Sequence, residues 1–227
     1  NAPYQATSIA HFWRRWHMTL SRLLRDALYI PLGGNRVGPW RRSLNALIVM
    51  TIGGLWHGAG WTFILWGAAH GTFLAVNHAW SDLCKKMGWT FTRTSRGWKT
   101  FAWGLTFMCV SLTWVLFRAA NLEAAGNMYA SLLGADGFLP AKIERTGLFV
   151  TAALMAIAFL APTTQRIMAN FEPALDYDPA QDEAQPLPAL ARWSWSPSLA
   201  AALAVGAALA VCTVNLGGVQ EFLYFNF

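Results

Sequence analysis

The chain contains one long stretch without a formal charge. From Ser43 to Ser81, 39 consecutive residues include no Asp, Glu, Lys or Arg, whereas about 20 apolar residues already cross a bilayer. Basic clusters flank the stretch on both sides, so the positive-inside rule places both ends in the cytoplasm. We therefore predict a membrane hairpin over 43–81, either two short passes or a re-entrant segment. Its break is expected at Gly58–Gly60, since irregular backbone at membrane depth is tolerated only where it is buried in protein or lines a cavity.

Residues 11–28 show the periodicity of an amphipathic helix. Arg15 and Arg22 lie opposite an apolar stripe, and His17 and Ser21 lie at the border between the two faces. The pattern predicts one interfacial helix, with its apolar side toward lipid or protein and its arginines toward headgroups. The stripe consists of Trp13, Trp16, Leu20, Leu23 and Leu24.

The segment 29–36 is predicted to end this helix. Pro31 disfavours helical geometry in the residue before it, and Gly33, Gly34 and Asn35 have the chemistry of a turn. A glycine loop that binds phosphate is the weaker interpretation, because the sequence contains neither GxxxxGK nor GxGxxG.

Three further charge-free segments, 100–117, 146–165 and 198–216, are each near the length of a transmembrane helix. Residues 166–192 combine acidic residues with prolines and predict an exposed loop. Residues 221–227 form an aromatic tail suited to a membrane interface. With the hairpin, these segments predict an all-α integral membrane protein, a polytopic helical bundle.

Composition supports a membrane protein and excludes several other classes. Hydrophobic residues make up 55% and charged residues 12% of the chain, about half the charged fraction of soluble domains. The net charge of +6 comes from clusters beside apolar spans and without any base-reading motif, so no nucleic-acid partner is expected. Cys84, Cys109 and Cys212 have no CxxC or Cys/His spacing, so neither disulfides nor a metal site is predicted. The chain begins at Asn1 without a signal peptide, and we expect further spans before it.

The histidines carry the candidate chemistry, because no GxSxG, SxxK or HExxH motif occurs. An imidazole can accept a proton from a substrate hydroxyl while that hydroxyl attacks an acyl thioester, without any acyl-enzyme. A second polar group would then have to offset the charge that develops on the thioester oxygen.

His57 lies beside the predicted break and is the first candidate for a general base; a structural hydrogen bond is the alternative. His17 is the second candidate, with anchoring to headgroups or backbone as its alternative. His70 lies on a helical face with apolar neighbours, which favours hydrogen bonding within the bundle. His11 and His78 lie near segment ends and are predicted to be structural.

Three ordered motifs carry a resemblance to a known family. They are HFWRRWHMTLS at 11–21, LYIPLGGNR at 28–36 and GLWHG at 54–58, followed by residues 61–71. They resemble the signature half of the membrane-bound O-acyltransferases, and most of all the branch of bacterial alginate O-acetyltransferases. Since members of the family are much longer, the resemblance implies that residues 1–227 are a partial membrane domain whose N-terminal half is missing.

The resemblance implies an O-acyltransferase of the bacterial inner membrane that acetylates an exported polysaccharide such as alginate. His57 matches the catalytic histidine of the family, in a tunnel across the membrane. His17 matches the Asn or His of the FxxxWN/H motif, which implies a donor-positioning role. We expect the tunnel to be lined by Trp13, Trp16, Trp56, Trp61, His70 and Asn77.

The expected donor is an acyl thioester, acetyl-CoA or an acyl carrier, used as a substrate, and no tightly bound cofactor is expected. The expected partners are membrane lipid, an extracytoplasmic acetyltransferase and the polysaccharide acceptor. Two alternatives remain open. One is a teichoic-acid D-alanyl transfer protein, a more distant relative in the same family. The other is a transporter or polysaccharide-export subunit, since broken helices at mid-membrane also occur in transporters.

Overall fold

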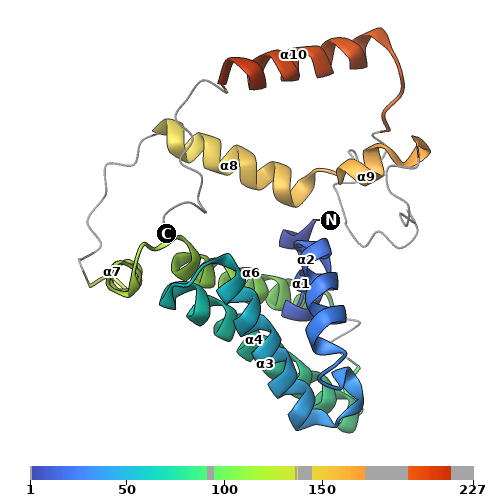
Figure 1. The fold of residues 1–227 in the computed structure, drawn as a ribbon. Coiled ribbons are helices and arrows are strands. Elements are labelled where there is room, and N and C mark those ends of the chain that lie inside the picture. Colours follow the sequence, from blue (N-terminus) through green and yellow to red (C-terminus); the bar gives the residue numbers. More distant parts are fainter. Residues whose placement is uncertain (1, 91–94, 136, 138–144, 172–193, 216–227) are drawn as a thin grey trace. The chain divides into compact units, whose positions relative to one another are not determined.

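The computed structural model describes residues 2–90, 95–135, 137, 145–171 and 194–215. Every regular element in these ranges is helical, and the chain divides into two compact units, one of residues 2–150 and one from Thr151 onward. The helices of the first unit (Figure 1) are α1 (Ile9–Arg15), α2 (Met18–Leu24), α3 (Pro39–His57), α4 (Trp61–Lys86), α6 (Arg96–Arg118) and α7 (Leu122–Leu132).

The second unit contains the end of α8 (Arg145–Leu160), α9 (Thr164–Ile167) and α10 (Leu199–Asn215). The predicted helix over 146–165 is therefore wrong at its C-terminal end. Pro162 cannot continue a helix and disfavours helical geometry in the residue before it, so α8 ends at Leu160 and a new turn begins at Thr164.

The predicted loop over 166–192 begins with helical turns, since α9 runs to Ile167 and a 3₁₀ turn covers Ala169–Phe171. Most of that loop, at 172–192, and the aromatic tail at 221–227 lie outside the described residues. The predicted segment 198–216 corresponds to α10, and 100–117 lies within α6. Within the described ranges, α6 alone is both long and apolar enough to cross a membrane.

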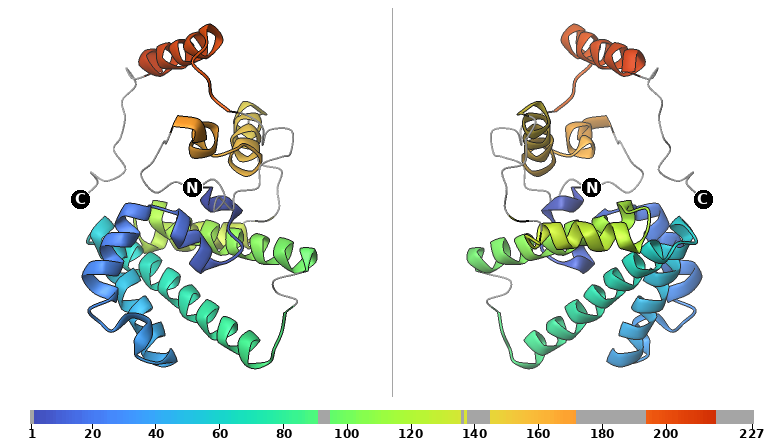
Figure 2. Two further views of the ribbon diagram at one scale, coloured as in Figure 1. Left: turned by 90° about the vertical axis from the view of Figure 1, so that its right-hand side faces the viewer. Right: turned by 90° about the vertical axis from the view of Figure 1, so that its left-hand side faces the viewer.

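The stretch 43–81 forms parts of two helices that pack side by side (Figures 1 and 2). Pro39 occupies the first turn of α3, where its missing N–H costs no hydrogen bond. The helix ends at His57, and α4 begins at Trp61, so the break lies at Gly58–Gly60 as predicted. With 19 and 26 residues, the two helices are about 28 and 39 Å long at 1.5 Å per residue.

Glycines set the distance between α3 and α4. A Cβ on Gly54 would overlap the carbonyl oxygen of Phe63, and a Cβ on Gly67 would overlap that of Met50. At Gly71 a Cβ would lie 2.6 Å from the Cα atom of Leu47. These contacts run in opposite directions along the two helices, so the hairpin is antiparallel. Small residues on both sides let the two backbones touch, as is common between membrane helices.

One side-chain contact closes the hairpin, and another attaches the preceding segment to it. Arg42 and Asp82 form a salt bridge of 2.5 Å that joins the start of α3 to the end of α4. The buried Asn45 side chain donates to the backbone carbonyl of Leu32 at 2.9 Å, which attaches the segment after α2 to α3.

The predicted single helix over 11–28 is wrong, because the chain breaks between α1 and α2. Ser8 caps α1 by accepting from the backbone N–H of His11, but Trp16 is extended and His17 is left-handed, with φ 39°. This break lets the Trp16 ring stack on Phe12 and meet Trp114 edge-on, with centroids 5.7 and 5.1 Å apart. The apolar period continues through the break, so periodicity does not reveal it.

We expect Gly67→Ala to destabilise the full-length protein by about 1–3 kcal/mol, because the added methyl group forces α3 and α4 apart. The measurement is thermal unfolding of the purified protein in detergent. Gly104→Ala is the matched control: Gly104 lies within α6, and its Cβ would meet nothing within 4 Å. That change should be neutral or stabilising by up to about 1 kcal/mol. Equal unfolding temperatures for the two variants would contradict this packing.

Candidate functional site

His57 is the last residue of α3 and is enclosed by aromatic rings. Its side chain is 7% exposed. Edge-on contacts join its ring to Trp56, Trp66 and Phe117, with centroids 5.0, 5.4 and 5.0 Å away. The helix therefore places an imidazole in an apolar environment directly before the irregular backbone at Gly58–Gly60.

His17, which belongs to the motif at 11–21, lies close to the aromatic rings around His57. Its ring meets the indole of Trp56 edge-on, with centroids 6.4 Å apart, and Trp56 in turn contacts His57. His17 is exposed, and its backbone is in the left-handed region. Among residues other than glycine, Asn, Asp and His enter this region most readily. The backbone at this break therefore restricts which residue can stand at position 17.

His70 has both ring nitrogens engaged and is 1% exposed. The indole Nε1–H of Trp13 donates to Nδ1 at 3.3 Å, and the Thr113 hydroxyl lies 2.9 Å from Nε2. An indole nitrogen can only donate, so Nδ1 is the acceptor and the neutral ring carries its proton on Nε2, which donates to Thr113. The Thr113 hydroxyl donates in turn to the carbonyl of Val110 at 2.8 Å. His70 thus joins α1, α4 and α6 within the bundle.

Trp66 connects the two buried histidines and was missed by the sequence reasoning. Its side chain is 5% exposed, and its ring lies 5.4 Å from His57 and 4.9 Å from His70. The spacing of four residues from Trp66 to His70 places both on one face of α4, which is the signal that could have found it. Phe117, at the end of α6, contacts both Trp66 and His57 and was also missed.

The residues predicted to line one tunnel do not surround a common cavity in the described part of the chain. Trp61 is 69% exposed and Trp56 is 60% exposed. Trp16 packs in the aromatic core against Phe12. Trp13 lines a cavity of about 280 Å³, whereas Asn77 lines a different one of about 900 Å³. Within the described ranges, no three His, Cys, Asp or Glu side chains form a group that could hold a metal ion.

The fold and the site define a helical protein with a buried histidine at the break between two closely packed helices. The chain belongs to the membrane-bound O-acyltransferase family, whose model matches residues 2–118. It is therefore a member of a family of membrane proteins, and the match covers all the histidines discussed above.

Two similar proteins act on polysaccharides, according to their names. A peptidoglycan O-acetyltransferase of Helicobacter pylori is 49% identical over 137 residues, which are 60% of this chain and 25% of that protein. A probable alginate O-acetylase of Pseudomonas fluorescens is 43% identical over 162 residues, which are 70% of this chain and 31% of that protein. The chain thus spans between a quarter and a third of the length of these relatives.

A third relative transfers a different acyl group. A teichoic acid D-alanyltransferase of Streptococcus thermophilus is 34% identical over 131 residues, which are 51% of this chain and 31% of that protein. The names of all three relatives describe acyl transfer.

We expect His70→Leu to destabilise the full-length protein, because it leaves the indole N–H of Trp13 without its acceptor at a cost of about 1–3 kcal/mol. A double-mutant cycle with Trp13→Phe, read by thermal unfolding, separates this loss from the change of shape. Because Trp13→Phe removes the donor, the double variant should lose less than the sum of the two single changes. Additive losses would contradict the hydrogen bond.

Proposed function

We propose that the full-length protein is a membrane-bound O-acyltransferase that moves an acetyl group from a thioester donor toward an exported polysaccharide. The observation that carries this proposal is the place of His57, a buried imidazole beside an irregular segment, enclosed by Trp56, Trp66 and Phe117. Family membership and relatives named as O-acetyltransferases support the same reaction class.

In this mechanism, His57 is the general base. An acceptor hydroxyl attacks the thioester carbonyl while the imidazole takes its proton. The tetrahedral intermediate then expels the thiolate, which receives the proton from the imidazolium, so the products are an ester and a free thiol. General-base assistance of this kind is typically worth about 10²- to 10⁴-fold. The apolar rings around His57 exclude water, which would otherwise hydrolyse the thioester.

His17 has a positioning role in this proposal. Its ring contacts Trp56, which also contacts His57. The left-handed backbone at position 17 holds the His17 imidazole on this side of Trp56, beside the proposed reaction site. As an exposed polar group, it is suited to hold the donor thioester or to offset charge on its oxygen. The donor is acetyl-CoA or an acyl carrier, acting as a substrate rather than a bound cofactor.

The acceptor class is a glycan polymer, with alginate as one candidate. Relatives named for peptidoglycan and for alginate share O-acetylation of a polysaccharide, and both lie at 43–49% identity. We propose a multi-pass location in the bacterial inner membrane, with tunnel walls completed by residues outside this chain. An extracytoplasmic acetyltransferase would complete the transfer to the polymer.

D-alanyl transfer to teichoic acid is the second candidate, and the Streptococcus thermophilus relative supports it. The two candidates use different donors: D-alanyl transfer needs a carrier protein that an adenylating enzyme loads, whereas acetyl transfer does not. Incubation of membranes with labelled acetyl-CoA or with labelled D-alanyl carrier separates them.

We expect His57→Gln in the full-length protein to lower acetylation of extracytoplasmic polysaccharide by about 10²-fold or more, because it removes the base. The measurement is the acetyl content of the polymer, normalised to the amount of protein in the membrane. His70→Leu is the comparison, and its activity per folded molecule should change much less. Unchanged acetylation in His57→Gln would exclude His57 as the base. If the reconstituted full-length protein passed polymer across the membrane without acyl turnover, the transport alternative would be favoured.

A further inference from the structure

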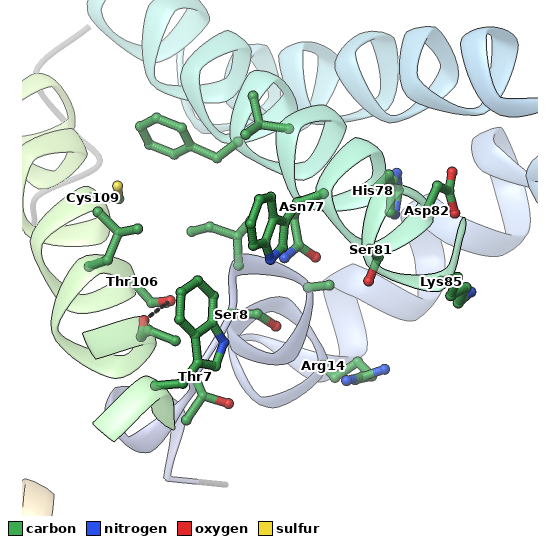
Figure 3. A pocket seen from close by; sticks show the side chains of 18 of the residues that line it. Thr7, Ser8, Arg14, Asn77, His78, Ser81, Asp82, Lys85, Thr106 and Cys109 are labelled. Atoms are coloured by element: carbon green, nitrogen blue, oxygen red, sulfur yellow. Dashed lines mark hydrogen bonds between the residues drawn. The ribbon is translucent and has the colours of Figure 1, made fainter. Parts of the chain in front are cut away.

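A cavity of about 900 Å³ lies between α1, α4 and α6, apart from the histidine site. Neither His57, His17 nor His70 lines it. Figure 3 shows that Arg14 of α1, Ser81 and Lys85 of α4, and Thr106 and Cys109 of α6 are all among the residues that line it. Its volume is within the range of sites for small molecules, about 300–1,000 Å³.

The charged side chains of this cavity leave a positive surplus. Arg42 is neutralised by its salt bridge with Asp82, the one carboxylate in the lining. Among the described residues, no carboxylate forms a salt bridge with Arg14 or Lys85. The site therefore offers two cations, Arg14 and Lys85, to an anion.

The lining changes from apolar to basic along α4. Phe73 and Val76 lie at one end, and Ser81 and Lys85 lie about one to three turns further on. The facing wall of α6 contributes mainly apolar side chains. Those apolar α6 residues are Trp98, Phe101, Ala102 and Leu105. The cavity thus fits an amphipathic molecule whose anionic group lies toward Lys85 and whose apolar part runs along α6.

Indole rings mark the basic end of the cavity. Trp80 of α4 and Trp98 of α6 stack with centroids 5.7 Å apart, and both line the cavity. Tryptophans gather at the boundary between hydrocarbon and headgroups, and basic residues gather beside the cytoplasmic leaflet. Basic pockets between membrane helices near the cytoplasmic leaflet are suited to anionic lipid headgroups.

We propose that this cavity binds an anionic phospholipid, with its phosphate between Arg14 and Lys85 and an acyl chain along the apolar wall of α6. A soluble phosphate-bearing thioester is the other source of the same chemistry. The lining argues against it, because the cavity contains neither His57, the proposed base, nor His17, which is proposed to position the donor. The lipid site does not depend on the acyl-transfer assignment.

The test uses the full-length protein in nanodiscs of phosphatidylcholine with phosphatidylglycerol, followed by delipidation and mass spectrometry of the lipid that remains bound. Phosphatidylglycerol should be retained over phosphatidylcholine by about tenfold or more. Each of Arg14→Gln and Lys85→Gln should reduce that preference by about fivefold, since one basic residue near an anionic surface contributes about that factor.

Two controls separate a specific site from general charge and from misfolding. Arg41→Gln removes an exposed charge beside Arg42 that does not line the cavity, and it should leave the preference unchanged. Lys85→Arg keeps the cation and should keep the preference for phosphatidylglycerol, whereas Lys85→Gln should lower it.

Three results would overturn the proposal. One is equal retention of both lipids by the wild type, and another is the same loss in Arg41→Gln as in the cavity variants. The third comes from a titration with soluble acetyl-CoA. If acetyl-CoA binds saturably and needs Arg14 and Lys85, while replacement of these residues leaves lipid retention unaffected, the cavity belongs to the donor instead. Because retention is measured without turnover, failure here leaves the His57 proposal to its own test.

Discussion

The close approach of α3 and α4 is the constraint on which the rest of the first unit depends. Gly54, Gly67 and Gly71 let the two backbones touch over several turns. This contact fixes the register between the end of α3 and the middle of α4. As a consequence, Trp66 lies between His57 and His70, and α6 can place Phe117 against the same cluster. A side chain at any of these glycines would change the position of His57 relative to its neighbours.

The two buried histidines have different surroundings, and the proposed mechanism gives them different roles. His70 is held by Trp13 and Thr113, so its lone pair and its proton are both committed to the protein. His57 is at the end of its helix, beside the irregular backbone at Gly58–Gly60, which is where the proposed mechanism places the substrate. Under the proposed mechanism, His70 serves the stability of the bundle and His57 serves the chemistry, and both imidazoles contact the indole ring of Trp66.

The sequence predicted the features that depend on local chemistry. The break at Gly58–Gly60 follows from its glycines, and the bundle role of His70 follows from its apolar helical face. Two helix boundaries differ from the prediction because another effect overrides the apolar pattern. The helix breaks at His17 because Trp16 packs in the aromatic core. The helix α8 ends at Leu160 because of Pro162. Trp61 was predicted to line a tunnel and is exposed, whereas Trp66 is buried. The two lie five residues apart on different faces of α4, and the rotation of the helix decides which face packs inward. Such a rotation is fixed by tertiary contacts and not by periodicity alone.

The central claim is that His57 is the general base at the site where the acyl donor binds. The most direct measurement is carbethoxylation of histidines in the active full-length protein, mapped by mass spectrometry with and without acetyl-CoA or an acyl carrier. The account predicts that modification of His57 inactivates the enzyme, that the donor protects His57, and that His70 stays unmodified because it is 1% exposed. Inactivation without modification of His57, or modification of His57 that no thioester donor slows, would contradict it.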